Sequence, residues 1–174
     1  MQIKTICYAG ALCMLLAACQ PRVEYALDGP TVGAQDFSVI EGDWVGTLTY
    51  TDYGSGELTE IATRSTVTSV SDTNIEYTIS YPDEPWENSR STISLSEDGR
   101  LIDGHVISDR VTDEEGTLIV TTDHRGEDDN RQADIRQTYS ISPTNFYIRK
   151  SVRFNANEAF LVRNIYEYER LEND

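Results

Sequence analysis

The sequence predicts an all-β domain folded as an antiparallel up-and-down barrel of about 8–10 strands. From Gly42 onward, apolar and aromatic residues alternate with polar ones, and no window shows a helical period. Short turn signals separate these runs, so consecutive strands are expected to be antiparallel neighbours. An open sheet of that length would expose two unpaired edges, which closure removes. We therefore expect a barrel, with a two-sheet sandwich as the alternative.

The expected strands, about nine in number, follow one another from residue 42, and each is followed by a turn. The first strand places Trp44, Leu48 and Tyr50 on one face, with Gly46 between them. Prolines at positions 82 and 85 interrupt the pattern, so a longer loop is expected around Trp86. Later strands place these residues on a shared face: Ile75, Tyr77, Ile79 and Tyr81; Ile93 and Leu95; Ile135, Tyr139 and Ile141; Phe146, Ile148 and Val152; Phe160, Val162, Tyr166 and Tyr168. Turn signals stand at 53–56, 71–74, 97–99, 114–116, 126–130, 142–145 and 155–157.

Residues 1–18 have the pattern of a secretory signal peptide, with one positive charge at Lys4 and then a short apolar run. That run is shorter than the roughly 20 residues that a membrane-spanning helix needs. Residues 16–19, Leu-Ala-Ala-Cys, resemble the lipobox of bacterial lipoproteins. The resemblance implies cleavage before Cys19 and lipid attachment to its thiol; an ordinary signal peptide followed by a chance cysteine is the alternative. It also implies outer-membrane sorting in a Gram-negative host, because Gln20 stands where inner-membrane lipoproteins have Asp.

The remaining chain is expected to form a tether and one domain. Residues 19–40 would be the lipidated N-terminus and tether, with a short helix near Gln35–Ile40 that begins at Asp36, and residues 41–174 the barrel. The chain has 14 Lys and Arg against 30 Asp and Glu, a net charge of −16, which argues against nucleic acids and anionic membrane surfaces as partners. Cys19 is the single cysteine after residue 18, which excludes disulfides and cysteine-ligated metal sites.

The start of the first strand carries a second resemblance. Gly42-Asp43-Trp44 resembles the Gly-x-Trp motif that begins lipocalins and related calycin barrels. The resemblance implies that Trp44 closes one end of the barrel and that Arg170, near the end of the last strand, packs across it as a cation–π contact worth roughly 0.5–2 kcal/mol. The second lipocalin motif, the disulfide and the helix after the barrel are missing, so the implied fold is lipocalin-like. The run from Trp44 to Arg170 also resembles uncharacterised bacterial envelope proteins of this type.

Neither the histidines nor the acidic residues form a recognisable catalytic or metal-binding pattern. His105 and His124 are the only histidines, lie on different expected strands and lack ligand spacing, so surface or rim positions are predicted. The acidic run 127–130, preceded by Asp123, is interpreted as a solvated loop, because its spacing differs from that of a calcium loop. No nucleophile elbow or phosphate loop is present. We therefore expect no metal, no cofactor and no enzymatic activity.

Tyrosines are the most suggestive group. Six of them are expected to point inward, where each hydroxyl needs a hydrogen-bond partner. A cavity that holds water or a small amphipathic ligand would supply partners, whereas the alternative is that the tyrosines fill the core. The sequence thus favours an outer-membrane-anchored protein that binds a small, partly apolar ligand; the alternative is a structural or accessory envelope protein that acts through protein–protein contacts. The expected ligand contacts are Tyr50, Tyr77, Tyr81 and Trp86.

Overall fold

The computed structural model describes residues 29–171, so the predictions for the signal peptide, Cys19 and Gln20 lie outside the described residues. Three short helices occur in it: α1 (Ala34–Phe37), η1 (Ser38–Ile40) and η2 (Pro85–Glu87). All other regular structure is strand. The ten strands are β1 (Gly42–Thr51), β2 (Leu58–Val70), β3 (Asn74–Ser80), β4 (Ser89–Ser94), β5 (Leu101–Ile102), β6 (His105–Thr112), β7 (Leu118–Asp128), β8 (Arg131–Ile141), β9 (Asn145–Arg153) and β10 (Leu161–Arg170).

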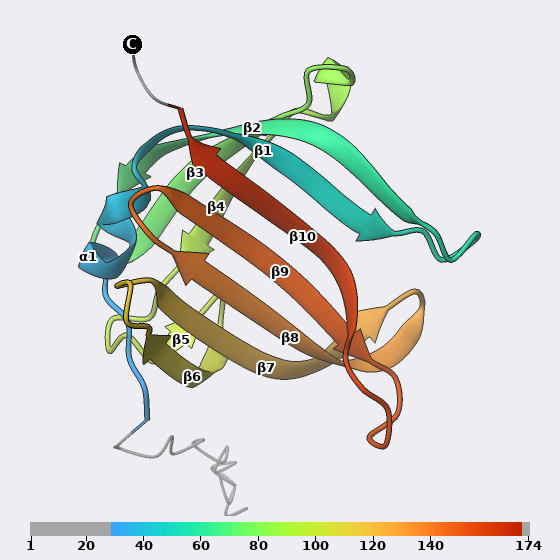
Figure 1. Ribbon diagram of the computed structural model, residues 1–174. Coiled ribbons are helices and arrows are strands. Elements are labelled where there is room, and N and C mark those ends of the chain that lie inside the picture. Colours follow the sequence, from blue (N-terminus) through green and yellow to red (C-terminus); the bar gives the residue numbers. More distant parts are fainter. Residues whose placement is uncertain (1–28, 172–174) are drawn as a thin grey trace, which may run out of the picture.

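The strands form a single antiparallel meander that closes on itself (Figure 1). Their order is β4-β3-β2-β1-β10-β9-β8-β7-β6-β5, so the first and last strands pair, and Trp44 lies opposite Arg170. A lone bridge between Leu95 and Ile102 joins the two ends of this order. The prediction of an all-β, antiparallel up-and-down barrel of about 8–10 strands is therefore confirmed.

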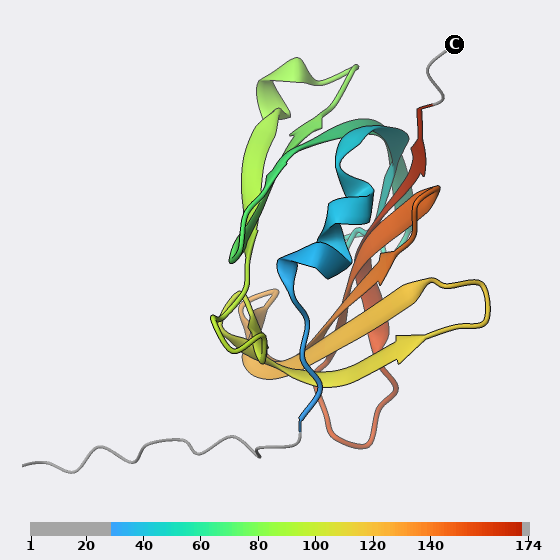
Figure 2. The same ribbon diagram turned by 90° about the vertical axis from the view of Figure 1, so that its left-hand side faces the viewer.

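One end of the barrel is closed by the segment before β1. Figure 2 shows α1 and η1 lying across the ring of strands at this end. Phe37 and Ile40 are 0% and 2% exposed, and the ring of Phe37 meets that of Tyr139 edge-on at 6.4 Å. The helix begins after Gly33, whose N–H donates to the Asp36 carboxylate over 2.9 Å. Part of the segment expected as tether thus packs into the barrel.

The apolar core occupies this closed half of the barrel. Trp44 lies at its centre with no exposed surface, and its indole N–H donates to the Ile40 carbonyl over 2.8 Å. The ring of Phe146 meets the indole edge-on at 4.8 Å. The other core residues are mainly Ile, Val and Leu on the inward positions of the strands. No helix within residues 29–171 has the length and apolar character needed to cross a membrane.

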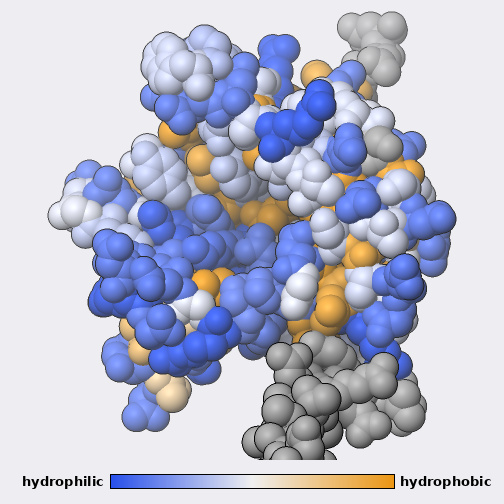
Figure 3. All heavy atoms as spheres, turned by 180° about the vertical axis from the view of Figure 1, so that it is seen from behind, coloured by the Kyte–Doolittle hydropathy of each residue, from blue (hydrophilic) through white to orange (hydrophobic). Residues whose placement is uncertain are grey.

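The barrel wall is incomplete at one place. Because β5 has only two residues, the edge of β4 meets it through the single Leu95–Ile102 bridge. On the other side, β6 pairs with β7 only as far as Ile107 and Thr122, so residues 123–128 of β7 have no strand on that edge within residues 29–171. A side opening therefore separates β4 from the second half of β7. Seen from behind, the surface is hollowed near its middle, with hydrophobic side chains at the floor of the recess (Figure 3).

Candidate ligand-binding site in the barrel interior

The half of the barrel beyond the core contains two adjoining chambers of about 180 and 300 Å³. They share four lining residues: Tyr77, Gln137, Ile148 and Lys150. The smaller chamber is further lined by Ile79, Asn164, Tyr166 and Tyr168, and the larger by Ile93, Asp103, His105, Thr122, His124, Ile135 and Tyr139. The interior is therefore hollow rather than solid, with apolar and hydrogen-bonding groups on facing walls.

Strand alternation places these residues inside. On β8 the inward positions are Ile135, Gln137 and Tyr139, and the facing positions of β9 carry Ile148 and Lys150. Polar residues thus occupy inward positions that would be apolar in a solid barrel. Sequence reasoning missed Gln137, Lys150 and Asn164 because it took the apolar members of each strand as the mark of the inner face. The signal that could have identified them is a polar residue at an otherwise apolar inward position, occurring at the same level on neighbouring strands.

Two contacts satisfy some of the inward tyrosines, whereas the Tyr168 hydroxyl is buried without a hydrogen-bond partner in the described part of the chain. The hydroxyls of Tyr81 and Tyr166 lie 3.0 Å apart, and the Tyr139 hydroxyl donates to the Asp103 carboxylate over 3.3 Å. Burial raises the pKa of the Tyr77, Tyr139 and Tyr166 phenols above the ordinary value of 10.0. These phenols are therefore neutral near pH 7, and their oxygens can accept hydrogen bonds in the chambers.

Of the four expected ligand contacts, one lines the chambers and a second contacts a lining residue. Tyr77 lines both chambers, whereas Tyr81 lines neither and is hydrogen-bonded to Tyr166, which lines the smaller one. Tyr50 is half-buried and lines neither chamber, and Trp86 is 75% exposed on η2. Trp86 belongs to a proline-flanked helical turn, so the alternation of a strand does not direct it inward.

A buried carboxylate at the far end of the barrel departs from the expected solvated acidic loop. Asp128 is 8% exposed; it accepts hydrogen bonds from Lys150 Nζ and the Tyr53 hydroxyl, each over 2.5 Å, and the Arg163 Nε lies 3.7 Å away. Burial opposes ionisation of Asp128, but these donors outweigh it, so its pKa lies below the ordinary value. Burial and the bond to Asp128 raise the pKa of Tyr53 to about 12. The network joins the β1–β2 turn to β7, β9 and β10.

The two residues expected to close the barrel are in contact. The guanidinium carbon of Arg170 lies 4.2 Å from the centre of the Trp44 ring. Arg170 also donates to the carbonyls of Pro143, Glu41 and Val39 over 2.6, 2.9 and 2.5 Å. The arginine therefore ties the indole to the chain on both sides of the closed end.

The histidines and acidic groups hold no metal-type cluster within residues 29–171, where no three or more His, Cys, Asp or Glu residues converge. His105 and His124, expected on the surface or rim, are half-buried and line the larger chamber. Their rings stack face to face, with centroids 3.5 Å apart and an angle of 2° between the planes. Their pairing depends on how β6 and β7 align, which spacing along the chain does not reveal.

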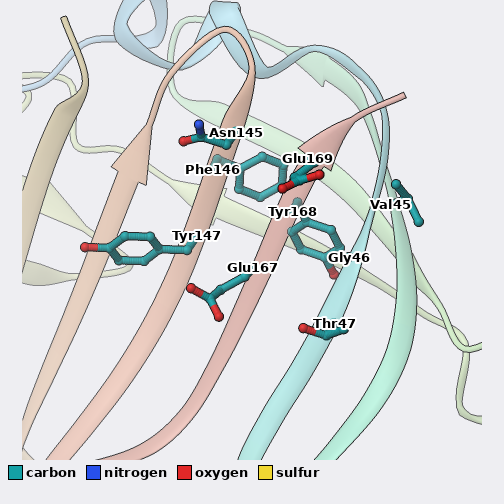
Figure 4. A pocket seen from close by; sticks show the side chains of 9 residues that line it. All are labelled: Val45, Gly46, Thr47, Asn145, Phe146, Tyr147, Glu167, Tyr168 and Glu169. Atoms are coloured by element: carbon teal, nitrogen blue, oxygen red, sulfur yellow. The ribbon is translucent and has the colours of Figure 1, made fainter. Parts of the chain in front are cut away.

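A larger hollow of about 630 Å³ lies on β1, β9 and β10 and opens to the outside of the barrel (Figure 4). Its lining includes the outward residues Val45, Thr47, Glu167 and Glu169. Val45 is 41% exposed, so a ligand there would stay in contact with water on one side. The interior chambers enclose more of a small molecule and are the better candidate site.

Comparisons with known proteins leave the family open. No family model matches the chain, and no curated protein matches it. Among solved structures, the crystal structure of a point mutant of the fluorescent protein UnaG is similar, with a TM-score of 0.41 and 10% sequence identity. That match covers 78% of this chain and 99% of the other. The fold assignment rests on the strand pairing of the chain itself, and nothing about function is taken from this likeness.

Proposed function

We propose that the protein binds a small, partly apolar molecule inside a lipocalin-like barrel and is not an enzyme. The observation that carries the proposal is the pair of adjoining chambers of about 180 and 300 Å³ in a barrel of only ten strands. Small-molecule sites typically have volumes on the order of 300–1,000 Å³, mostly apolar walls and a few directional polar groups.

The lining favours a ligand with an apolar body and more than one hydrogen-bonding group. Ile79, Ile135 and Ile148 supply apolar contact, and Gln137 and Asn164 supply amides that both donate and accept hydrogen bonds. Lys150 is held by Asp128, so its charge is largely compensated. A fully apolar ligand would leave these amides without partners, at a cost of about 1–3 kcal/mol each.

Filling the chambers tests the proposal. Gln137 lines both chambers, so Gln137→Trp should remove most of the free volume, whereas Val45→Trp adds the same side chain to the outer face. The probe is 1-anilinonaphthalene-8-sulfonate, followed by fluorescence titration of folded protein. We expect saturable binding to the wild type and to Val45→Trp, weakened at least about tenfold in Gln137→Trp. Equal binding by all three proteins, each shown to be folded by circular dichroism, would refute an interior site.

We further propose that lipid on Cys19 anchors the mature chain to the outer membrane. Two or three acyl chains hold a protein firmly on a bilayer, whereas one gives only marginal binding. Cys19→Ser should therefore move the protein from the membrane fraction to the soluble periplasmic fraction. Cys13→Ser, inside the expected signal peptide, is the matched control and should leave the fractionation unchanged. Membrane retention of Cys19→Ser would rule out this anchor.

An accessory role in the envelope is the second candidate, and two exposed apolar side chains favour it. Leu58 and Trp86 are 72% and 75% exposed and lie at the β1–β2 and β3–β4 connections, at the end of the barrel opposite α1. Exposed aromatic anchors are typical of protein–protein contacts. Photo-crosslinking from position 86 in intact cells should recover a specific partner if this role is correct. Recovery of no partner, with intact ligand binding, would favour the binding protein alone.

A further inference from the structure

The stacked histidines lie at the border of the side opening. His105 is the first residue of β6, and His124 is on β7 two residues beyond Thr122, where the register between β6 and β7 ends. The imidazole stack, with centroids 3.5 Å apart, therefore continues the β6–β7 contact at a position where strand pairing has stopped.

The segment that His105 belongs to has few other attachments. The β5–β6 hairpin pairs over only two positions and turns through Asp103 and Gly104, whose φ angles are 51° and 79°. Toward β4 and the residues after it, the hairpin is joined by the Leu95–Ile102 bridge, by the hydrogen bonds between Ser94 and Asp103, and by those between Ser96 and Leu101. An element with so few backbone hydrogen bonds is expected to open locally at a lower free energy than the rest of a barrel.

From this geometry we propose that the His105–His124 stack is a pH-sensitive latch on the side opening: neutral imidazoles hold the β5–β6 hairpin against β7, and protonation of both releases it. Two neutral rings can lie face to face at this distance, whereas two imidazolium ions would place like charges at van der Waals contact. Separation of the rings relieves that repulsion, and it widens the opening to the larger chamber, which both rings line.

The groups around His124 disfavour a positive charge on that ring. Burial lowers the pKa of His124, the positive charges of His105 and Lys150 lower it further, and Asp123 opposes them. Asp123 is already engaged by Arg136 and Ser108 on the outer face. On the hairpin itself, the Asp103 carboxylate accepts hydrogen bonds from Ser94 and Tyr139 and lies two residues before His105 in the chain. The facing phenols of Tyr77 and Tyr139, whose pKa values burial raises, are neutral near pH 7 and add no negative charge beside the rings.

The direction of the pH effect follows from proton binding. The closed state holds His124 with a pKa below the ordinary 6.5, so it binds fewer protons than a state in which the ring is exposed. The latch is therefore complete above about pH 7 and is lost as the pH falls through the ordinary histidine range. Ligand access would follow the same profile; this last step rests on the proposed ligand-binding function, but the latch itself does not.

Amide hydrogen exchange tests the latch without any ligand. Protection factors, corrected for the intrinsic pH dependence of exchange, are compared at about pH 7.5 and pH 5. We expect the amides of residues 103–107 to lose protection at least about tenfold at the lower pH, and those in the β8–β9 pairing to keep theirs.

The double variant His105→Phe, His124→Phe retains stacking without protonation and should stay protected at both pH values. Should it fail to fold, the single variant His124→Phe serves, because one charge cannot repel a neutral ring. Wild-type protection that is equal at both pH values would overturn the proposal.

The consequence for access is measured separately. Stopped-flow release of 1-anilinonaphthalene-8-sulfonate, whose sulfonate keeps its charge over this range, should be at least about fivefold faster at pH 5 than at pH 7.5 in the wild type and unchanged in the phenylalanine variant. Identical release rates would overturn the role of the latch in access and leave the binding function standing. Absence of probe binding would remove the binding function, while the exchange experiment would still decide whether the latch exists.

Discussion

At the scale of single residues, Trp44 shows how one side chain closes a barrel. It has no exposed surface, donates its indole N–H to the Ile40 carbonyl, meets Phe146 edge-on and is covered by the Arg170 guanidinium. Its apolar body fills the closed end while its one polar atom is satisfied. The arginine is satisfied in turn by three backbone carbonyls, so neither polar group is buried without a partner.

Trp44→Ala should destabilise the fold by about 3–5 kcal/mol, because it leaves a large cavity and removes the ring that Arg170 covers. Urea unfolding followed by circular dichroism measures this loss. Trp86→Ala is the matched control, since its side chain is 75% exposed, and it should change stability by less than about 0.5 kcal/mol. A loss of unfolding free energy below about 1 kcal/mol for Trp44→Ala would show that Trp44 does not stabilise the closed end of the barrel.

The residues that could be predicted are those whose role follows from local sequence. Trp44 and Arg170 stand at the start of the first strand and the end of the last, and barrel closure brings such positions together. The histidine pair could not be found in this way. His105 faces His124 only because of the β6–β7 register, and that register contains a shift between Ile107 and Asp109. Counting along the chain does not reveal such a bulge.

At the scale of elements, strand alternation predicted most of the barrel but not the division between β5 and β6. The Asp103-Gly104 dipeptide carries the signal of a tight hairpin turn, and both residues have positive φ. This dipeptide divides the segment between the turn signals at 97–99 and 114–116, which the turn signals alone predict to be one strand. The resulting two-residue β5 is too short to show any alternation, yet it is the reason for the side opening.

The plug formed by α1 and η1 is the element that links the N-terminal segment to the core. Phe37→Ala should cost about 3–5 kcal/mol, because its ring is fully buried against Tyr139. Val39→Ala in the same plug should cost less than about 0.5 kcal/mol, because Val39 is 41% exposed. Both are measured by urea unfolding. Equal small losses would mean that the plug is not part of the cooperative fold, and that the barrel is stable with this end open.

At the scale of the whole molecule, the closed end of the barrel provides most of the apolar packing, and the chambers provide the candidate binding site. The apolar core surrounds Trp44 and the plug, whereas the chambers lie beside it among tyrosines, amides and histidines, and Ile93, Tyr139 and Tyr168 belong to both. Polar groups inside the barrel weaken packing there, and the closed half supplies the burial that offsets it. The side opening and its histidines belong to the polar half, where local motion leaves the core intact.

The closure of the barrel depends on the seam between β1 and β10, and Gly46 lies in that seam opposite Tyr168. A Cβ at Gly46 would overlap the carbonyl oxygen of Glu167 and press on the Tyr168 ring, so Gly46→Ala must push the first and last strands apart. We expect a loss of about 1–3 kcal/mol or more by urea unfolding, and faster amide exchange along both strands of the seam. Thr49→Ala, on the outer face of β1, should leave both measurements nearly unchanged. If Gly46→Ala proved as stable as the wild type, the two strands would not be packed this closely, and the ring would be open at the seam as well as beside β5.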